Sequence, residues 1–353
     1  MPSVHSRRDF LAAAAAVGAS PLLLGTTAKG REPLPVIGSG SHMYEVIHDW
    51  GQLPSGTVLG NTHGVVEDAQ GHIHVHHTVG KASRNPDTVL VLDGRGRFVR
   101  SWGRQFGPGA HGMNIRHEGR EEFLYLSDSV HSVVTKRTLK GEEVWTLGYP
   151  DESPAYRKSP VPNSATGRNY RPTNVAVAPN GDVYVADGYG AFYVNVYDSS
   201  ARFKFTFGGP GKEAGKFDTP HGLWIDSRSS TPTLWVADRA NSRIQTFALD
   251  GRHLGFVDGT KWPCHFHERR GTVVVPDLLG RVTLLDSTNA VIGHLGDLNV
   301  SAIGDVIRLR AGVAGSFPAG KFICPHGATF DHDGNIFVVE WVEAGRITKL
   351  RRL

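Results

Sequence analysis

The sequence predicts an all-β protein built as a six-bladed β-propeller, and two observations lead to this fold class. First, residues 171–251 contain one pattern twice: short runs rich in β-branched and aromatic residues, separated by Gly, Pro, Asn and Asp. Each copy is typical of a four-stranded antiparallel meander. Second, looser copies recur at a spacing of roughly 45 residues, as in propeller blades that pack face to face around a channel.

The composition agrees with a turn-dense β-protein. The chain has 353 residues, with 43 Gly, 20 Pro and 39% hydrophobic residues, and it shows no long amphipathic helical pattern. One large domain accounts for this length. The formal net charge is only +4, and the basic residues are scattered along the chain. This pattern argues against a nucleic-acid-binding surface, so we expect no nucleic-acid partner.

The N-terminus is expected to be a leader rather than part of the fold. Arg7 and Arg8 precede an apolar run at 11–24 that is too short and too rich in Ala to span a bilayer well. Residues 1–28 therefore resemble a twin-arginine signal peptide, which predicts a periplasmic or secreted protein without stable membrane insertion after cleavage. The alternative is a cytosolic helix with a basic start. Residues 29–43 are expected to be a linker, and residues 44–353 to be the propeller.

The strands can be assigned to blades in chain order. Residues 44–50 form one strand without partners of its own, and the last repeat stops at its third strand, 347–350. We therefore expect the N-terminal strand to complete the last blade, which removes open sheet edges. Two long intervals at 149–170 and 296–317 are expected to be insertions between blades. The innermost strands are expected to start at His63, His111, Asn174, His221, Cys264 or His265, and His326.

Histidine recurs at these starting positions. Innermost strands run beside the channel, so their first residues should form a ring around one mouth. His111, His221 and His326 each precede a Gly and an apolar strand. Three neutral imidazoles are a donor set that zinc prefers, and they leave one position open for water or substrate. The alternative is that the histidines cap inner strands by hydrogen bonding across the channel. Further candidate axial residues are His63, Cys264, His265 and Cys324.

The two clearest repeats also resemble a known family. The segments that carry the likeness are Pro172–Val177, Val185–Tyr189, Phe217–His221 and Val236–Gln245. They are similar to the NHL-repeat propeller of peptidyl-α-hydroxyglycine α-amidating lyase, closely over blades three and four and more weakly elsewhere. The resemblance implies that His111, His221 and His326 bind zinc. It also implies that Tyr189 is the catalytic tyrosine and that Arg239 is an active-site arginine.

Two departures from that family bear on the substrate and the metal. The lyase has another catalytic arginine in blade one, where this chain has His76, His77 and Thr78. It also has an aspartate calcium ligand after its last zinc histidine, where this chain has Gly327. Calcium would have to be held by backbone carbonyls near Val65 and Met113. A changed substrate or metal follows from these differences.

We therefore expect a secreted metal-dependent lyase that acts on a small, hydroxyglycine-like or peptide-derived substrate at the channel mouth. Tyr189 would exchange a proton and Arg239 would anchor a carboxylate or developing oxyanion. One alternative is a noncatalytic NHL-repeat propeller that binds a peptide, a glycan or a protein. Another is a calcium-dependent lactonase-like hydrolase, which would need carboxylates at the axis.

The two cysteines of the chain, Cys264 and Cys324, are expected at the starts of adjacent inner strands. They would then form a disulfide or approach the metal together, and the alternative is a pair of buried free thiols.

Overall fold

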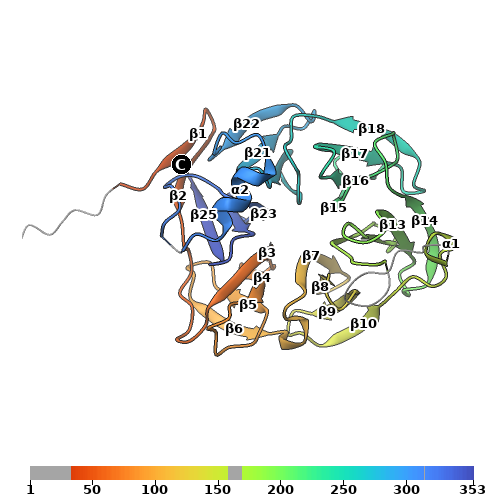
Figure 1. Ribbon diagram of the computed structural model, residues 1–353, viewed down its shortest axis with the longest axis horizontal. Helices are drawn as coiled ribbons and strands as arrows, with labels where there is room; N and C mark the ends of the chain where they lie inside the picture. The colour runs from red at the N-terminus through yellow and green to blue at the C-terminus, as the bar shows by residue number, and fades with distance from the viewer. Residues whose placement is uncertain (1–32, 158–168, 314) are drawn as a thin grey trace, which may run out of the picture. The chain divides into compact units, whose positions relative to one another are not determined.

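The computed structural model describes residues 33–157, 169–313 and 315–353, and the expected leader at 1–28 lies outside them. Five sheets of four strands and one of five strands surround a central channel (Figure 1). This arrangement confirms the predicted six-bladed propeller. No helix in the described ranges has the length and apolar character needed to cross a membrane.

In the first five blades, consecutive strands pair antiparallel from the channel outward. Blade one consists of β3 (Leu59–Glu67), β4 (Ile73–Val79), β5 (Val89–Leu92) and β6 (Phe98–Trp102). Blade two consists of β7 (Ala110–Glu118), β8 (Glu121–Asp128), β9 (Val133–Thr138) and β10 (Glu143–Leu147). Blade three consists of β11 (Asn174–Val177), β12 (Val183–Ala186), β13 (Tyr193–Tyr197) and β14 (Phe203–Gly208). Blade four consists of β15 (Pro220–Asp226), β16 (Thr233–Asp238), β17 (Arg243–Phe247) and β18 (His253–Val257). Blade five is β19 (His267–Arg269), β20 (Thr272–Asp277), β21 (Arg281–Leu285) and β22 (Val291–Leu295).

Blade six joins the two ends of the propeller. Its inner strands are β23 (Pro325–Phe330), β24 (Ile336–Glu340) and β25 (Arg346–Arg352), followed by β2 (His42–Ile47) and β1 (Val36–Ser39). Tyr44 of β2 pairs with Arg352 of β25, which confirms the expected closing strand.

Residues 36–43, expected within the linker, instead form most of the β1–β2 hairpin. Ser39 pairs with His42 across a two-residue Gly-Ser turn, in which Gly40 has a φ of 56°. Such turns favour hairpins because their left-handed backbone matches the twist of the strands. The Gly-Ser-His-Met segment is polar, so the sequence did not indicate that a hairpin forms here.

The blades are held together by apolar contacts between neighbouring sheets. Each of the six blade-to-blade interfaces has its own buried cluster within the described chain. At the interface of blades six and one, for example, Phe337 packs with Val75 and Leu90. Burial of such side chains contributes about 25 cal/mol per Å² of apolar area removed from water. The packed blades thereby hold the inner strands in a rigid ring.

In the part of the chain that the structure describes, three short helices lie in the connections between blades. They are the 3₁₀ helix Arg104–Phe106 and the α-helices α1 (Pro154–Arg157) and α2 (Ile303–Arg310). Both α-helices fall in the expected insertions. Val306 of α2 is buried in a cluster that includes Cys264 and Cys324, so α2 covers the inner part of blades five and six (Figure 1).

Candidate metal centre and active site

Three histidines form equivalent bridges from one blade to the next. The Nδ1 atom of His111 lies 2.8 Å from the Thr173 carbonyl oxygen, and that of His221 lies 2.8 Å from the Cys264 carbonyl oxygen. The Nδ1 atom of His326 lies 3.0 Å from the carbonyl oxygen of His63. These bonds define one ring of residues at the same level of the channel: His63, His111, Thr173, His221, Cys264 and His326.

Strand β11 begins at Asn174, as predicted, but the residue of blade three at the level of the ring is Thr173. Of the two candidates in blade five, Cys264 lies at the level of the ring. Asn174 and His265 lie level with the glycines that follow the ring histidines. A Cβ atom on Gly112 would approach the Cα atom of Asn174 at 3.0 Å, and one on Gly222 would approach the Cα atom of His265 at 2.9 Å. Blades three and five thus contribute Thr173 and Cys264 to the ring, and His265 lies one layer deeper in the channel.

A β-bulge at each His-Gly pair aims the imidazole into the channel. From Pro220 to Leu223 strand β15 advances by three residues, whereas its partner advances by two, from Asp238 to Val236. The same register shift occurs in β7 and in β23. Bulges bend a strand and redirect a side chain, and they are common beside functional sites. The sequence showed the recurring His-Gly pairs but not the bulges that explain them.

The hydrogen bonds fix which ring nitrogen faces the axis. A carbonyl oxygen can only accept, so Nδ1 of His111, His221 and His326 must donate, and Nε2 of the neutral ring carries a lone pair. Burial is the main cause that lowers the pKa of His111 to about 3 and holds those of His221 and His326 well below the ordinary range. All three imidazoles are neutral at pH 7, which is the form that binds metals.

These imidazoles lie close to one another at the centre of the ring. The three ring centroids of His111, His221 and His326 are 4.6–4.9 Å apart. The structure therefore brings the predicted metal ligands together.

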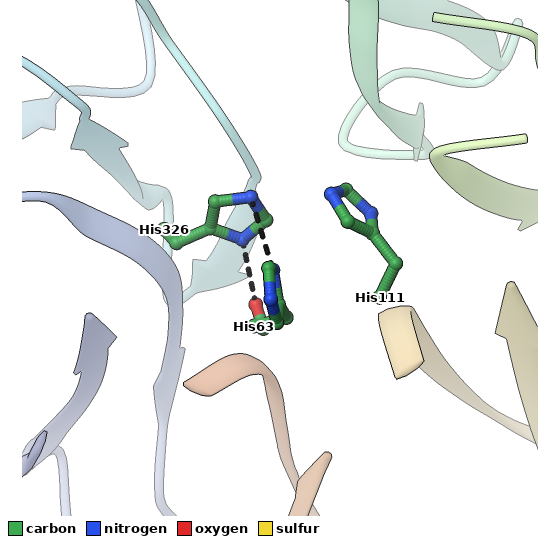
Figure 2. A group of neighbouring side chains, drawn as sticks. All are labelled: His63, His111 and His326. Carbon is green, nitrogen blue, oxygen red and sulfur yellow. Dashed lines mark hydrogen bonds between the residues drawn. The ribbon is translucent and has the colours of Figure 1, made fainter. Parts of the chain in front are cut away.

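Two overlapping sets of donor atoms occur at this centre. The ligand atoms of His63, His111 and His326 all lie within 4.8 Å of one another (Figure 2), and so do those of His221, Cys264 and His326. His63 Nδ1 is 3.5 Å from His326 Nε2. Buried lone pairs that face one another are unfavourable without a proton or a cation between them, so this donor set fits a zinc-like ion.

Tyr189 and Arg239 meet at the same centre. The Tyr189 hydroxyl oxygen is 3.1 Å from Nε2 of His111 and 3.1 Å from Nε2 of His221. Arg239 Nη1 donates to that oxygen at 3.1 Å, and the guanidinium lies 5.2 Å from the Tyr189 ring centroid. A hydroxyl has one proton, so Tyr189 can donate to only one of the two imidazoles. The Nε2 lone pair of the other imidazole is left for another partner.

Two buried aspartates hold the loops that carry these residues. Asp187, which directly follows the second strand of blade three, accepts hydrogen bonds from the backbone N–H groups of Arg171 and Ala191 and from the Tyr156 hydroxyl. Asp238 has the corresponding role before Arg239 and accepts from Asn241, Arg243 and Gln245. The Asp-Gly-Tyr and Asp-Arg segments are thus positioned by their own first residue.

A second guanidinium near the site, that of Arg310, was not predicted from the sequence. Arg310, at the end of α2, donates to the Trp341 carbonyl oxygen at 2.9 Å and to Asn61 Oδ1 at 2.8 Å. Its Cζ atom lies 3.5 Å from the Trp341 ring centroid. Its charge adds to burial and to the neighbouring imidazoles in lowering the pKa of His63. The insertion that contains Arg310 does not follow the repeat pattern, so its unusual length was the only feature of the sequence that could have indicated a functional residue there.

The two cysteines are buried free thiols, which excludes the disulfide alternative for this structure. Burial raises the pKa of Cys264 to about 11 and also raises that of Cys324. Both groups are therefore neutral thiols at pH 7, and Cys264 would bind a metal as a thiolate only after losing its proton.

Blade one differs from the resembled family as expected. His76 is fully buried, and neither of its ring nitrogens has a hydrogen-bond partner in the described chain. Burial lowers its pKa to about 3, so His76 is neutral and cannot replace the positive charge of an arginine.

No protein-family model matches the sequence. Human NHL repeat-containing protein 3 is 30% identical over 185 residues, which cover 50% of each chain. Mouse peptidyl-glycine alpha-amidating monooxygenase is 26% identical over 264 residues, covering 71% of this chain and 24% of that protein. A probable peptidyl-alpha-hydroxyglycine alpha-amidating lyase of Caenorhabditis elegans is 24% identical over 318 residues, covering 84% and 83%. The chain thus spans only half of the length of human NHL repeat-containing protein 3 and 24% of that of the mouse monooxygenase. It resembles both NHL-repeat proteins and amidating lyases.

Solved structures share the architecture. A streptogramin B lyase aligns with a TM-score of 0.56 and 12% identity over 87% of this chain and 97% of its own. A gluconolactonase of Xanthomonas campestris aligns with a TM-score of 0.57 and 15% identity over 87% and 89%. At such identities the likeness shows the fold alone.

Proposed function

We propose that this chain is a metal-dependent lyase of the amidating type, which cleaves a small, peptide-derived α-hydroxyglycine at the channel mouth. The observation that supports it most is the contact of one tyrosine hydroxyl with two imidazoles and a guanidinium. Tyr189 and Arg239 occupy the positions that the resemblance to amidating lyases marks as catalytic. The low-identity lyase relatives support the same reaction class.

His111, His221 and His326 would hold the metal, with His63 and Cys264 beside it. When bound, a zinc ion supplies a Lewis acid that polarises the substrate hydroxyl. Arg239 is nearly buried, with 8% of its surface exposed, so a carboxylate that reaches it would form a strong charge-assisted pair. A structural calcium ion held by carbonyls near Val65 and Met113 remains part of the proposal.

In the proposed reaction, Tyr189 acts in its deprotonated form, with its oxygen beside the Arg239 guanidinium, and accepts the proton of the substrate hydroxyl. The hydroxyl-bearing carbon then becomes a carbonyl as its bond to nitrogen breaks. Tyr189 returns the proton to the leaving nitrogen, so the products are an amide and a small oxo acid. Proton transfer by a positioned side chain contributes about 10²–10⁴-fold to such rates. Arg239 neutralises the carboxylate or the negative charge that develops beside the hydroxyl.

The test separates metal binding from turnover. Untagged wild type, Tyr189→Phe, Arg239→Ala and His221→Ala are compared for bound metal and for cleavage of an N-acyl-α-hydroxyglycine. We expect Tyr189→Phe and Arg239→Ala to retain metal and to lose rate, and His221→Ala to lose both. His332→Ala, whose side chain is 67% exposed on the surface, is the matched control. Normal metal content in His221→Ala, or full activity in the other two variants, would contradict the proposal.

A second candidate is a noncatalytic propeller that binds a peptide, a glycan or a protein. The 30% identity to NHL repeat-containing protein 3 and the missing arginine in blade one favour it. Elemental analysis distinguishes the two candidates, because stoichiometric zinc supports the lyase and metal-free protein supports the binding module.

We also propose export by the twin-arginine route, based on Arg7, Arg8 and the apolar run that follows them. Changing both arginines to lysine should leave the precursor in the cytoplasm. Unchanged export of that variant would refute the assignment.

A further inference from the structure

A cavity lies toward the other end of the inner strands. It has a volume of about 230 Å³, and most of its lining residues come from the inner strands of blades one to five, one to six positions beyond the ring residues. Its polar and aromatic lining includes Asn114, Arg116, Trp224, His265, His267 and Glu268. The candidate metal centre occupies the starts of these strands, so this cavity opens at the opposite mouth. It has room for considerably more than one water molecule, which takes about 30 Å³ of liquid volume.

Two histidines of blade five give the cavity one built-in acceptor and one built-in donor. Nδ1 of His265 donates to the Ala328 carbonyl oxygen at 3.2 Å, so Nε2 of the neutral ring is an acceptor. This Nε2 atom has no partner in the described chain, and His265 is only 4% exposed. His267 has the reverse arrangement: its Nδ1 accepts the Phe330 backbone N–H at 3.0 Å, so its Nε2 carries the proton. An unpartnered buried acceptor is costly and calls for a ligand or water.

Opposite charges line the two sides of the cavity. Arg116 belongs to blade two and Glu268 to blade five, which lie across the channel from each other in a ring of six. One nitrogen of Arg116 donates to the Val177 carbonyl oxygen at 3.1 Å, and one oxygen of Glu268 accepts the Gly271 N–H at 2.6 Å. A guanidinium has five N–H donors and a carboxylate can accept several hydrogen bonds, so each side chain has hydrogen-bonding capacity left for a ligand.

We propose that this cavity binds a small zwitterion, the chemical class of amino acids and short peptides. Arg116 of blade two would receive its carboxylate, and Glu268 of blade five, on the other side of the channel, would receive its ammonium group. The free Nε2 atom of His265 and the Nε2–H group of His267 would supply further hydrogen bonds to the ligand. A simple anion would meet the charge of Glu268, and a simple cation would meet that of Arg116, so a molecule with both charges is complementary. This site is separate from the proposed lyase centre and does not depend on its activity.

The experiment is a calorimetric titration of the full chain with glycine, β-alanine, 4-aminobutyrate and diglycine, which differ in the separation of their charges. Acetate and methylammonium are the singly charged controls. We expect at least one zwitterion to bind about tenfold more tightly than either control. Trp224 lines the cavity, so binding should also change the tryptophan fluorescence, and Trp224→Phe should reduce that change.

Three variants decide the outcome. Arg116→Gln and Glu268→Gln should each weaken binding of the best zwitterion by about tenfold or more. Arg97→Gln, which alters an exposed arginine paired with Asp93, should not. Two variants of the site are used so that a folding defect in one leaves the other decisive. The proposal is overturned if no zwitterion binds at about 10 mM. It is equally overturned if acetate binds as tightly as the zwitterions, or if both site variants retain wild-type affinity.

Discussion

Replacement of Gly222 by alanine should damage both the fold and the metal centre. The added Cβ atom would lie 2.4 Å from the Cys264 carbonyl oxygen and 2.9 Å from the His265 Cα atom. Both contacts involve backbone of the next blade, which must retreat by about 1 Å, and such overpacking typically costs 1–3 kcal/mol. The same carbonyl oxygen accepts the hydrogen bond of His221 Nδ1, so its movement also removes about 1 kcal/mol of net hydrogen bonding.

The expected total is a loss of about 2–4 kcal/mol in the free energy of unfolding, measured by urea denaturation. Metal content should fall as well, because the His221 ring loses the bond that orients it. Gly293→Ala is the matched control, since an added Cβ atom there meets no heavy atom within 4 Å. If Gly222→Ala matched Gly293→Ala in stability and in bound metal, the assignment of the His-Gly bulge as a device that aims the ligand would be refuted.

Two further predictions concern pH and the insertion helix. Burial lowers the pKa of His76 to about 3 and that of His77 to about 4, so the folded protein binds fewer protons than the unfolded chain below pH 6.5. The contribution of these two histidines to the free energy of unfolding should be complete above that pH and should fall on acidification, by up to about 1.4 kcal/mol per pH unit for each group. Urea denaturation at pH 7.5, 6 and 5 checks this prediction, and equal stability at all three pH values would count against it. Arg310→Ala should raise KM by about tenfold with unchanged metal content, because its guanidinium, stacked on Trp341, is close enough to His63 for its charge to lower the pKa of that imidazole. An unchanged KM would assign Arg310 a purely structural role.

Most of what could be predicted about the fold and the site came from the repetition in the sequence. The recurring strand pattern predicted six blades, the closing strand β2 and the gathering of His111, His221 and His326, because equivalent positions in a ring must face one axis. Thr173 was not recognised as a ring member, since it is not a histidine and its neighbour Asn174 looked closer to the pattern. In blade five the sequence left Cys264 and His265 as equal candidates. Arg310 could not be predicted, because its position depends on how a unique insertion packs on the channel. The β1 strand was missed because its turn has the composition of a loop.

The pairing of β2 with β25 has a consequence for the way the protein is made. A ribosome delivers β2 early, but its partner emerges only when nearly all of the chain has been synthesised. Until then five blades can form an open crescent whose terminal faces, including Val75 of blade one and Val274 of blade five, have no covering sheet. Contacts between residues so far apart in sequence slow folding and leave intermediates open to aggregation. Ring closure therefore follows the synthesis of all six blades, and a chaperone that shields the crescent should raise the yield of folded protein more than one that assists single blades.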